Sequence, residues 1–181
     1  MKTKLTTKQL IQIAVIAAIY AALTAVFMSI SFTTLQLRVS EIMVFLAYFN
    51  PISIIGLTLG CFLANLLMSP TPFLDCVFGT LATLLSVGAI SLTAKAFKGS
   101  KVGMMVASIW PVIFNAVIVG GMLCYAGFVP MEEGREIFSL IATMGSVGFG
   151  EMVVVMVMGI PVTYILMTKY KKIVNTYLVL K

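Results

Sequence analysis

Six polar side chains that could hold a ligand stand inside or beside otherwise apolar stretches of this 181-residue chain. They are, in chain order, Arg38, Glu41, Asn65, Asp75, Asn115 and Glu151. Carboxylates accept hydrogen bonds, arginine donates them, and a side-chain amide does both. A site built from these groups holds more carboxylates than cations, which suits a ligand rich in N–H donors.

The residue types do not indicate a hydrolytic or metal-binding site. The chain has no histidine, and its three cysteines, Cys61, Cys76 and Cys124, lie in apolar runs without paired spacing. No GxxxxGK[ST] phosphate loop occurs, and KGSK at 98–101 lacks its spacing. We therefore expect neither an enzyme nor a cofactor, and any ATP-driven process would need a partner.

The composition places these polar groups in a membrane protein. Hydrophobic residues make up 61% of the chain and charged residues only 10%, too few to cover a soluble globule of this length. Apolar runs near 9–29, 42–68, 73–94, 102–128 and 140–168 are each long enough for a transmembrane helix. The sequence predicts one all-helical domain over residues 1–181 in the bacterial plasma membrane.

The lysines define the expected topology. They cluster at Lys2, Lys4 and Lys8, at Lys95, Lys98 and Lys101, and at Lys169, Lys171, Lys172 and Lys181. Cytoplasmic loops concentrate basic residues, so an even number of crossings should separate the clusters. The run 42–68 must then be two helices, and Asn50-Pro51 offers the break.

Six transmembrane helices follow, near 36–49 and 51–69 as well as 9–29, 73–95, 103–126 and 143–168, with both termini cytoplasmic. The loop MEEGRE at 131–136 is then external. Five of the helices send a polar side chain into the outer half of the membrane. With 1.5 Å per residue, Glu151 lies about 12 Å and Asn115 about 16 Å below the outer helix ends.

Two interpretations of the polar residues stay open at this point. Buried charges in a membrane should pair or line a wet cavity, and Arg38 could simply pair with Glu41 one helical turn away. That pairing leaves Asp75 and Glu151 without a cation, since Arg135 is the other external one, so we favour a ligand pocket. Trp110 could add a flat apolar wall for an aromatic ligand.

Small residues form a stripe on the first helix. Its members, Ala14, Ala17, Ala18, Ala21, Ala22 and Ala25, fall within an arc of about 140° at 100° per residue. Such stripes let helices approach closely in lipid. The stripe predicts docking of another subunit, with packing inside the same chain as the alternative.

Five stretches carry a resemblance to a known family. They are LQLRVSE (35–41), GCFLANLL (60–67), LDCVFGTLATLLS (74–86), FNAVIVG (114–120) and GFGEMVVVMVMGIP (148–161). Through them the chain resembles the substrate-binding S components of energy-coupling factor (ECF) transporters, and within that group the queuosine-precursor transporter (QueT) family. The segment 129–139 is not part of the resemblance.

The resemblance implies uptake of a 7-deazaguanine base, such as the 7-cyano or 7-aminomethyl precursor of queuosine, or queuine. It also implies a transmembrane coupling subunit and two ATPase subunits, with docking through the alanine stripe. One carboxylate among Glu41, Asp75 and Glu151 would accept N1–H and the 2-amino group, and Arg38 or an asparagine would donate to O6. The alternatives are an S component for another vitamin or purine-like base and a stand-alone proton-coupled carrier.

Overall fold

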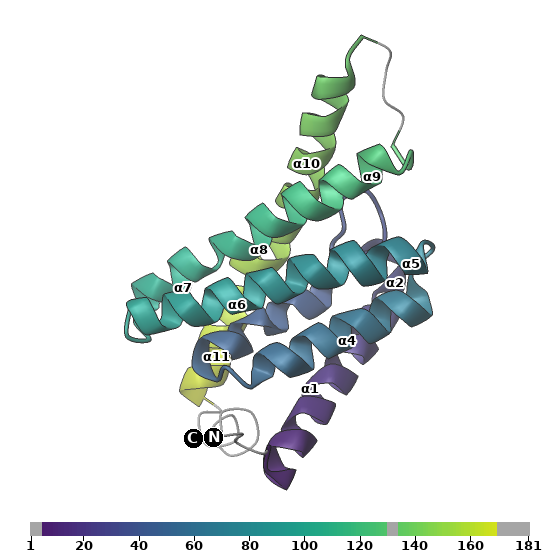
Figure 1. The fold of residues 1–181 in the computed structure, drawn as a ribbon. Helices are drawn as coiled ribbons and strands as arrows, with labels where there is room; N and C mark the ends of the chain where they lie inside the picture. The colour runs from purple at the N-terminus through teal and green to yellow at the C-terminus, as the bar shows by residue number, and fades with distance from the viewer. Residues whose placement is uncertain (1–4, 130–133, 170–181) are drawn as a thin grey trace.

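The protein is described by a computed structural model over residues 5–129 and 134–169, and within these ranges every regular element is helical (Figure 1). Four helices in this part are long and apolar enough to cross a membrane: Thr7–Val26, Pro72–Ala96, Lys101–Tyr125 and Glu136–Leu166. Val39–Phe49 and Ser53–Met68 are shorter apolar helices. The all-helical fold is confirmed, while six crossings and the cytoplasmic side of the termini stay predictions.

The helical elements follow one another with short connections. They are α1 (Thr7–Val26), α2 (Met28–Ser31), the 3₁₀ helix η1 (Val39–Phe45), α3 (Leu46–Phe49), α4 (Ser53–Met68), α5 (Pro72–Leu74), the π-helical η2 (Asp75–Gly79), α6 (Thr80–Ala96), α7 (Lys101–Ala107), α8 (Ile109–Phe114), the π-helical η3 (Asn115–Gly120), α9 (Gly121–Tyr125), α10 (Glu136–Met152), the π-helical η4 (Val153–Gly159) and α11 (Ile160–Lys169). The π-helical stretches are continuous with the α-helices on either side of them.

The predicted break at Asn50-Pro51 is confirmed. Asn50 leaves the helical region, with φ −144° and ψ 112°, as expected for a residue before proline. Its side-chain oxygen accepts a hydrogen bond from the backbone N–H of Ile52 at 3.1 Å. This Asx turn replaces helical hydrogen bonds and separates α3 from α4.

Polar caps fix two other helix starts. Thr6 and Gln9 form a reciprocal capping box at the start of α1, with distances of 2.9 and 3.3 Å. Ser100 accepts from the N–H of Gly103 at 3.1 Å at the start of α7. Gly99 just before it has a φ of +70°, a conformation that glycine adopts without steric cost.

Two predicted boundaries are wrong. The helix expected from residue 36 begins at Val39, because Gln36 is left-handed (φ 47°) and Arg38 is extended. The helix expected from residue 143 begins at Glu136, and exposed apolar side chains such as Phe138 continue it. Glu151 consequently lies about 22 Å from the helix start, instead of about 12 Å. The remainder of the predicted external loop, 131–133, lies outside the described residues.

The short segment η1–α3 occupies the middle of the bundle. It packs against α1, α6 and η4, and Val44, Phe45 and Ala47 are buried there. Helix α1 packs along α4, with which it makes its closest approach at Gly60. Figure 1 shows α4, α6 and the α7–α8 helix side by side, with α1 crossing beneath α4. This arrangement surrounds the first turn of η1 with other helices.

Candidate functional site

Glu41 lies in the first turn of η1 and is almost completely buried. Its Oε1 accepts hydrogen bonds from the hydroxyl of Tyr20 on α1 and from Thr83 Oγ1 on α6, the second at 3.2 Å. Its Oε2 is buried and has no hydrogen-bond partner within the described part of the chain. One oxygen of this carboxylate is therefore held by the protein, and the other is left for a donor that the protein does not supply.

Arg38 comes immediately before η1, and the extended backbone there turns its side chain into the bundle. Its Nη1 donates to Cys61 Sγ at 3.4 Å, and the guanidinium lies over the Phe32 ring at 5.3 Å. Its Nε has no partner. Among the described residues no carboxylate forms an ion pair with Arg38, although Glu41 and Asp75 are close enough to interact electrostatically. The contacts of Arg38 are thus not those of a simple structural pair with Glu41.

Asp75 begins η2 and is held by the turn between α4 and α5. Its Oδ2 accepts from the hydroxyls of Ser69 and Thr71, the latter at 2.8 Å, while Oδ1 is buried without a partner. The amide of Asn65 donates to the backbone carbonyl of Asp75 at 2.8 Å. Gly79 leaves room for that amide, since a Cβ there would come within 2.9 Å of Asn65 Nδ2.

Glu151 approaches the same region from α10. It is 3% exposed, its Oε1 has no partner, and it interacts electrostatically with Glu41 and Arg38. The neighbouring Gly150 packs directly on the Leu35 carbonyl, where any Cβ would overlap it. The connection that carries Arg38 therefore lies against the helix that carries Glu151.

Two predicted site residues are not brought into contact with this cluster. Asn115 is buried but donates to the carbonyl of Pro111 in its own helix, at 3.0 Å. Trp110 donates from Nε1 to Thr93 Oγ1 at 2.9 Å and stacks on Phe114. Because Thr93 is ten residues beyond Thr83 on α6, the indole bond lies roughly 15 Å along that helix from Glu41's partner.

Three residues of the cluster were missed from the sequence: Tyr20, Thr83 and Cys61. Cys61 Sγ is a shared neighbour, receiving contacts from Arg38, Asn65 and Thr83 at 3.3–3.4 Å. A tyrosine hydroxyl inside an alanine-rich helix was the one available signal, because a buried Tyr O–H needs a partner. Threonine and cysteine in apolar helices carry no such signal.

A cavity of about 290 Å³ opens beside the cluster. Asp75 lines it together with Phe32, Gln36, Thr71 and Phe128. Its size is at the lower end of the range for small-molecule sites, roughly 300–1,000 Å³. Phe32, which stacks on Arg38, connects this cavity to the buried guanidinium.

Irregular helical turns coincide with the polar residues. Asp75 begins η2, Asn115 begins η3, and Glu151 lies two residues before η4. Glu41 sits in a 3₁₀ helix. Such π-helical turns are rare and are frequent at functional sites, since they reorient side chains and free backbone groups. The four helices therefore deviate from α-geometry where they carry polar groups.

The unpartnered atoms define what the site can bind. Glu41 Oε2, Asp75 Oδ1, Asn65 Oδ1 and Glu151 Oε1 are acceptors, and Arg38 Nε is a donor. A buried polar atom without a partner costs free energy, so a ligand that supplies the missing partners is favoured. No group of three or more potential metal ligands occurs among residues 5–129 and 134–169. The arrangement suits an organic ligand with several N–H donors and one carbonyl acceptor.

The alanine stripe divides into two parts. Ala17 is buried and Ala21 half-buried toward α4, while the remaining members are exposed on the outer side of α1. These exposed members, called the outer alanine row below, are Ala14, Ala18, Ala22 and Ala25. A Cβ at Gly60 would come within 3.0 Å of Ala17 Cα. Part of the stripe thus packs within the chain, and the outer alanine row does not.

The family described as "QueT transporter" matches residues 10–168. The "Queuosine precursor transporter QueT" of Lactococcus lactis subsp. cremoris (strain MG1363) is 39% identical over 88 residues, which cover 46% of this chain and 51% of that relative. The chain thus spans about half the length of the curated relative it matches. No solved structure matches the chain.

The match covers the site as well as the fold. Residues 10–168 include every residue of the buried cluster, most of α1 and the whole of α2 to α10. Together with the long apolar helices, it identifies a multi-pass protein of the cell membrane. The chain belongs to the QueT transporter family.

Proposed function

We propose that this chain is the substrate-binding subunit, or S component, of an ECF-type importer for a queuosine precursor. The ligand is a 7-deazaguanine base, such as 7-cyano- or 7-aminomethyl-7-deazaguanine, or queuine. One observation carries the proposal: three buried carboxylates, Glu41, Asp75 and Glu151, each keep one oxygen without a partner around a single arginine. The name of the Lactococcus relative supports the choice of ligand.

The polar edge of a guanine-type base matches these vacant positions. N1–H and the 2-amino group lie side by side and donate to the two lone pairs of the vacant oxygen of one carboxylate, and O6 accepts from Arg38. Glu41 is the best placed carboxylate, because Tyr20 and Thr83 already hold its other oxygen and fix its orientation. An aminomethyl cation would be neutralised by Asp75 or Glu151.

Tyr20 gives the site a direct connection to the docking helix. Its hydroxyl contacts Glu41, while its backbone belongs to α1, whose opposite side carries the outer alanine row. A ligand that draws Glu41 toward itself would therefore act on α1. In the proposed importer, the outer alanine row docks the coupling subunit, and two partner ATPases supply the energy that this chain has no phosphate loop to obtain.

A stand-alone proton-coupled carrier is the second candidate function. It is favoured by one observation, the closeness of the buried carboxylates Glu41 and Glu151, which would repel each other if both were charged. In that account one of them carries a proton through the membrane.

Transport in proteoliposomes separates the two candidates. The purified chain alone should bind a labelled 7-deazaguanine but should not accumulate it inside the liposomes. Uptake should start when the coupling subunit and both ATPases are reconstituted with the chain and ATP is supplied on the side of the membrane that the ATPases face. ATP replaced by a non-hydrolysable analogue is the control. Uptake by the chain alone, driven by a pH gradient, would establish the carrier and overturn the S-component proposal.

A further inference from the structure

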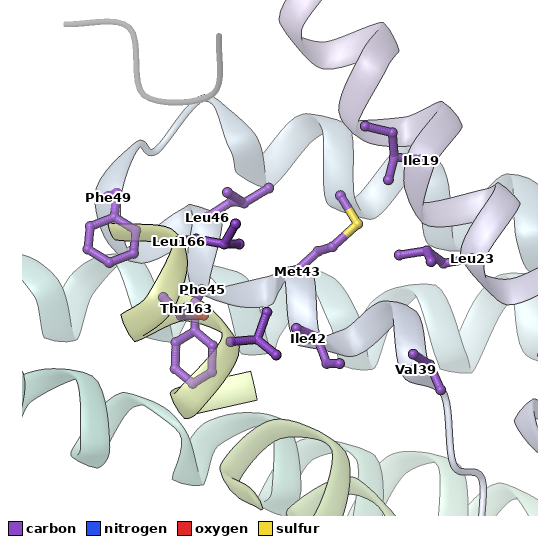
Figure 2. A pocket seen from close by; sticks show the side chains of 11 residues that line it. Ile19, Leu23, Val39, Ile42, Met43, Phe45, Leu46, Phe49, Thr163 and Leu166 are labelled. Carbon is purple, nitrogen blue, oxygen red and sulfur yellow. The ribbon is translucent and has the colours of Figure 1, made fainter. Parts of the chain in front are cut away.

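A second cavity lies on the other side of η1 from the polar cluster. Its volume is about 320 Å³, and it is enclosed by α1, the η1–α3 segment and α11. Figure 2 shows Met43 in the middle, between Ile19 and Leu23 of α1 on one side and Leu166 of α11 on the other. Thr163 is the one polar residue among the described residues that line it. This apolar groove takes no part in the site around Glu41.

The groove continues into a smaller cavity that several polar residues help to line. Phe49 and Thr163 line both, and the second cavity, of about 160 Å³, adds Ser100, Lys101 and Thr168. The ammonium of Lys101 lies over the ring of Tyr164 at 4.9 Å, which holds it at this end. No described residue that lines either cavity is acidic. An apolar channel thus ends in hydroxyl groups and a cation.

The length of the groove agrees with one layer of a bilayer. It follows Val39 to Phe49, which extends roughly 18 Å at about 2.0 Å per residue in the 3₁₀ part and 1.5 Å in the α part. Half of a hydrocarbon core of about 30 Å is about 15 Å. A single acyl chain that begins near Lys101 would therefore end near Val39.

We propose that this groove is a binding site for an anionic phospholipid. One acyl chain lies along Met43 and Leu46, and the phosphate is bound by the ammonium of Lys101 and the hydroxyl of Ser100. Two features favour this occupant. The apolar groove is about as long as one acyl chain, and the cation at its polar end complements a negative headgroup. Basic pockets between membrane helices recognise headgroups in this way. The site is separate from the proposed ligand pocket and does not rest on it.

Native mass spectrometry of the purified full chain tests the proposal. The probes are phosphatidylglycerol and phosphatidylcholine with identical acyl chains. The wild type should retain the anionic lipid in preference, and Lys101→Gln should reduce that preference by about fivefold, the effect of removing one basic residue near a lipid surface. Lys98→Gln is the matched control, because Lys98 is an exposed lysine of the same turn that does not line the groove.

A second variant tests the apolar part. Met43→Trp should fill the groove and lower retention of both lipids, while the helical circular-dichroism spectrum and the unfolding temperature stay those of the wild type. Leu46→Phe is the milder version should the first variant not fold. Equal retention of the two lipids by the wild type, or equal effects of Lys98→Gln and Lys101→Gln, would overturn the proposal.

A protein occupant gives a different result. If Met43→Cys in the assembled complex cross-links to the coupling subunit, the groove is a protein interface, and the lipid proposal is wrong. None of these readouts depends on transport. A failure of the lipid site is therefore distinguishable from a failure of the proposed function.

Discussion

At the scale of single residues, the central feature is that Glu41 and Asp75 each have one oxygen held by the protein and one vacant oxygen. Glu41 Oε1 is bound by Tyr20 and Thr83, and Asp75 Oδ2 by Ser69 and Thr71, while the second oxygen of each has no partner. Held oxygens fix the orientation of the group, so the vacant oxygens are positioned before a ligand arrives. Preorganisation of this kind lowers the entropic cost of binding.

Replacing Glu41 by glutamine tests the assignment of the base edge. The amide oxygen can keep the bonds from Tyr20 and Thr83, which places the new NH₂ group against ligand N–H donors. A buried mismatch of this sort costs about 1–3 kcal/mol, hence roughly tenfold to a few hundredfold in affinity. Calorimetric titration with a 7-deazaguanine measures the loss, and Glu136→Gln, an exposed carboxylate at the start of α10, should bind as the wild type does.

An analogue without the 2-amino group completes this experiment. The loss of affinity from wild type to Glu41→Gln should be smaller for this analogue than for the guanine-type ligand. Equal losses of affinity for both ligands would show that Glu41 does not bind the 2-amino edge, and would assign that contact to Asp75 or Glu151. No loss for either would leave Glu41 with a structural role.

At the scale of elements, the irregular turns and close helix contacts place the polar groups. Three long helices contain π-helical stretches at or next to Asp75, Asn115 and Glu151, and η1 is a 3₁₀ helix at Glu41. Contacts with very little space, at Gly60 and Gly150, fix how α1 and the 32–38 connection sit on the bundle. Substitutions at these contacts should therefore act at a distance from the chemistry.

The outer alanine row gives one such prediction. Ala18→Leu combined with Ala22→Leu should preserve ligand binding and abolish transport by the assembled complex, because both residues are exposed and face away from the core. Ala17→Leu should instead destabilise the chain by about 1–3 kcal/mol, since it faces Gly60 with no space for extra atoms. Binding, transport and thermal unfolding are measured for each. If the double variant still transports, the outer alanine row does not form the docking surface.

Gly150 and Gly145 form a matched pair on α10. A Cβ at Gly150 would overlap the Leu35 carbonyl, whereas one at Gly145 would meet no atom within 4 Å. Gly150→Ala should push the 32–38 connection away with Arg38 and reduce ligand affinity about tenfold or more, from a strain of about 1–3 kcal/mol. Gly145→Ala should leave affinity unchanged and stabilise the helix by about 0.5–1 kcal/mol. Equal affinities of the two variants would contradict the placement of this connection.

At the scale of the whole molecule, two cavities of different character lie at different places in the bundle. One is lined by Asp75 and Phe128 near the polar cluster, and the other is apolar and ends at Lys101. A single short segment, Val39–Phe49, carries Glu41 of the proposed ligand site and also lines the proposed lipid site. Its central position explains why a ligand bound at Glu41 could affect the packing of α1.

The sequence predicts the helical fold and the break at Asn50-Pro51 because both follow from local chemistry. Length and hydropathy predict the long helices, and proline with an Asx turn predicts the break. The predicted start of α10 is wrong because the sequence does not show whether exposed apolar residues such as Phe138 belong to a membrane helix or to the loop before it. Boundaries of this kind depend on the surroundings and leave no polar signal.

The candidate site was predicted in part for a similar reason. Isolated charged residues in apolar helices, such as Glu41 and Glu151, are costly and therefore conspicuous. Their partners Thr83 and Cys61 are ordinary residues of helix interiors, and only tertiary packing brings them to Glu41 and Arg38. Trp110 was predicted to line the site because of its aromatic ring. Its indole N–H instead donates to Thr93, which lies on α6 away from Thr83 and Glu41.

Calorimetric titration of the purified chain with a panel of ligands measures whether the site beside Arg38 binds a 7-deazaguanine base. The panel contains 7-cyano-7-deazaguanine, 7-aminomethyl-7-deazaguanine and queuine, with riboflavin, thiamine and folate as controls. The vacant carboxylate oxygens beside Arg38 predict saturable one-to-one binding of at least one 7-deazaguanine and no heat from the three vitamins. Saturable binding of a vitamin with no response to any 7-deazaguanine would contradict the account.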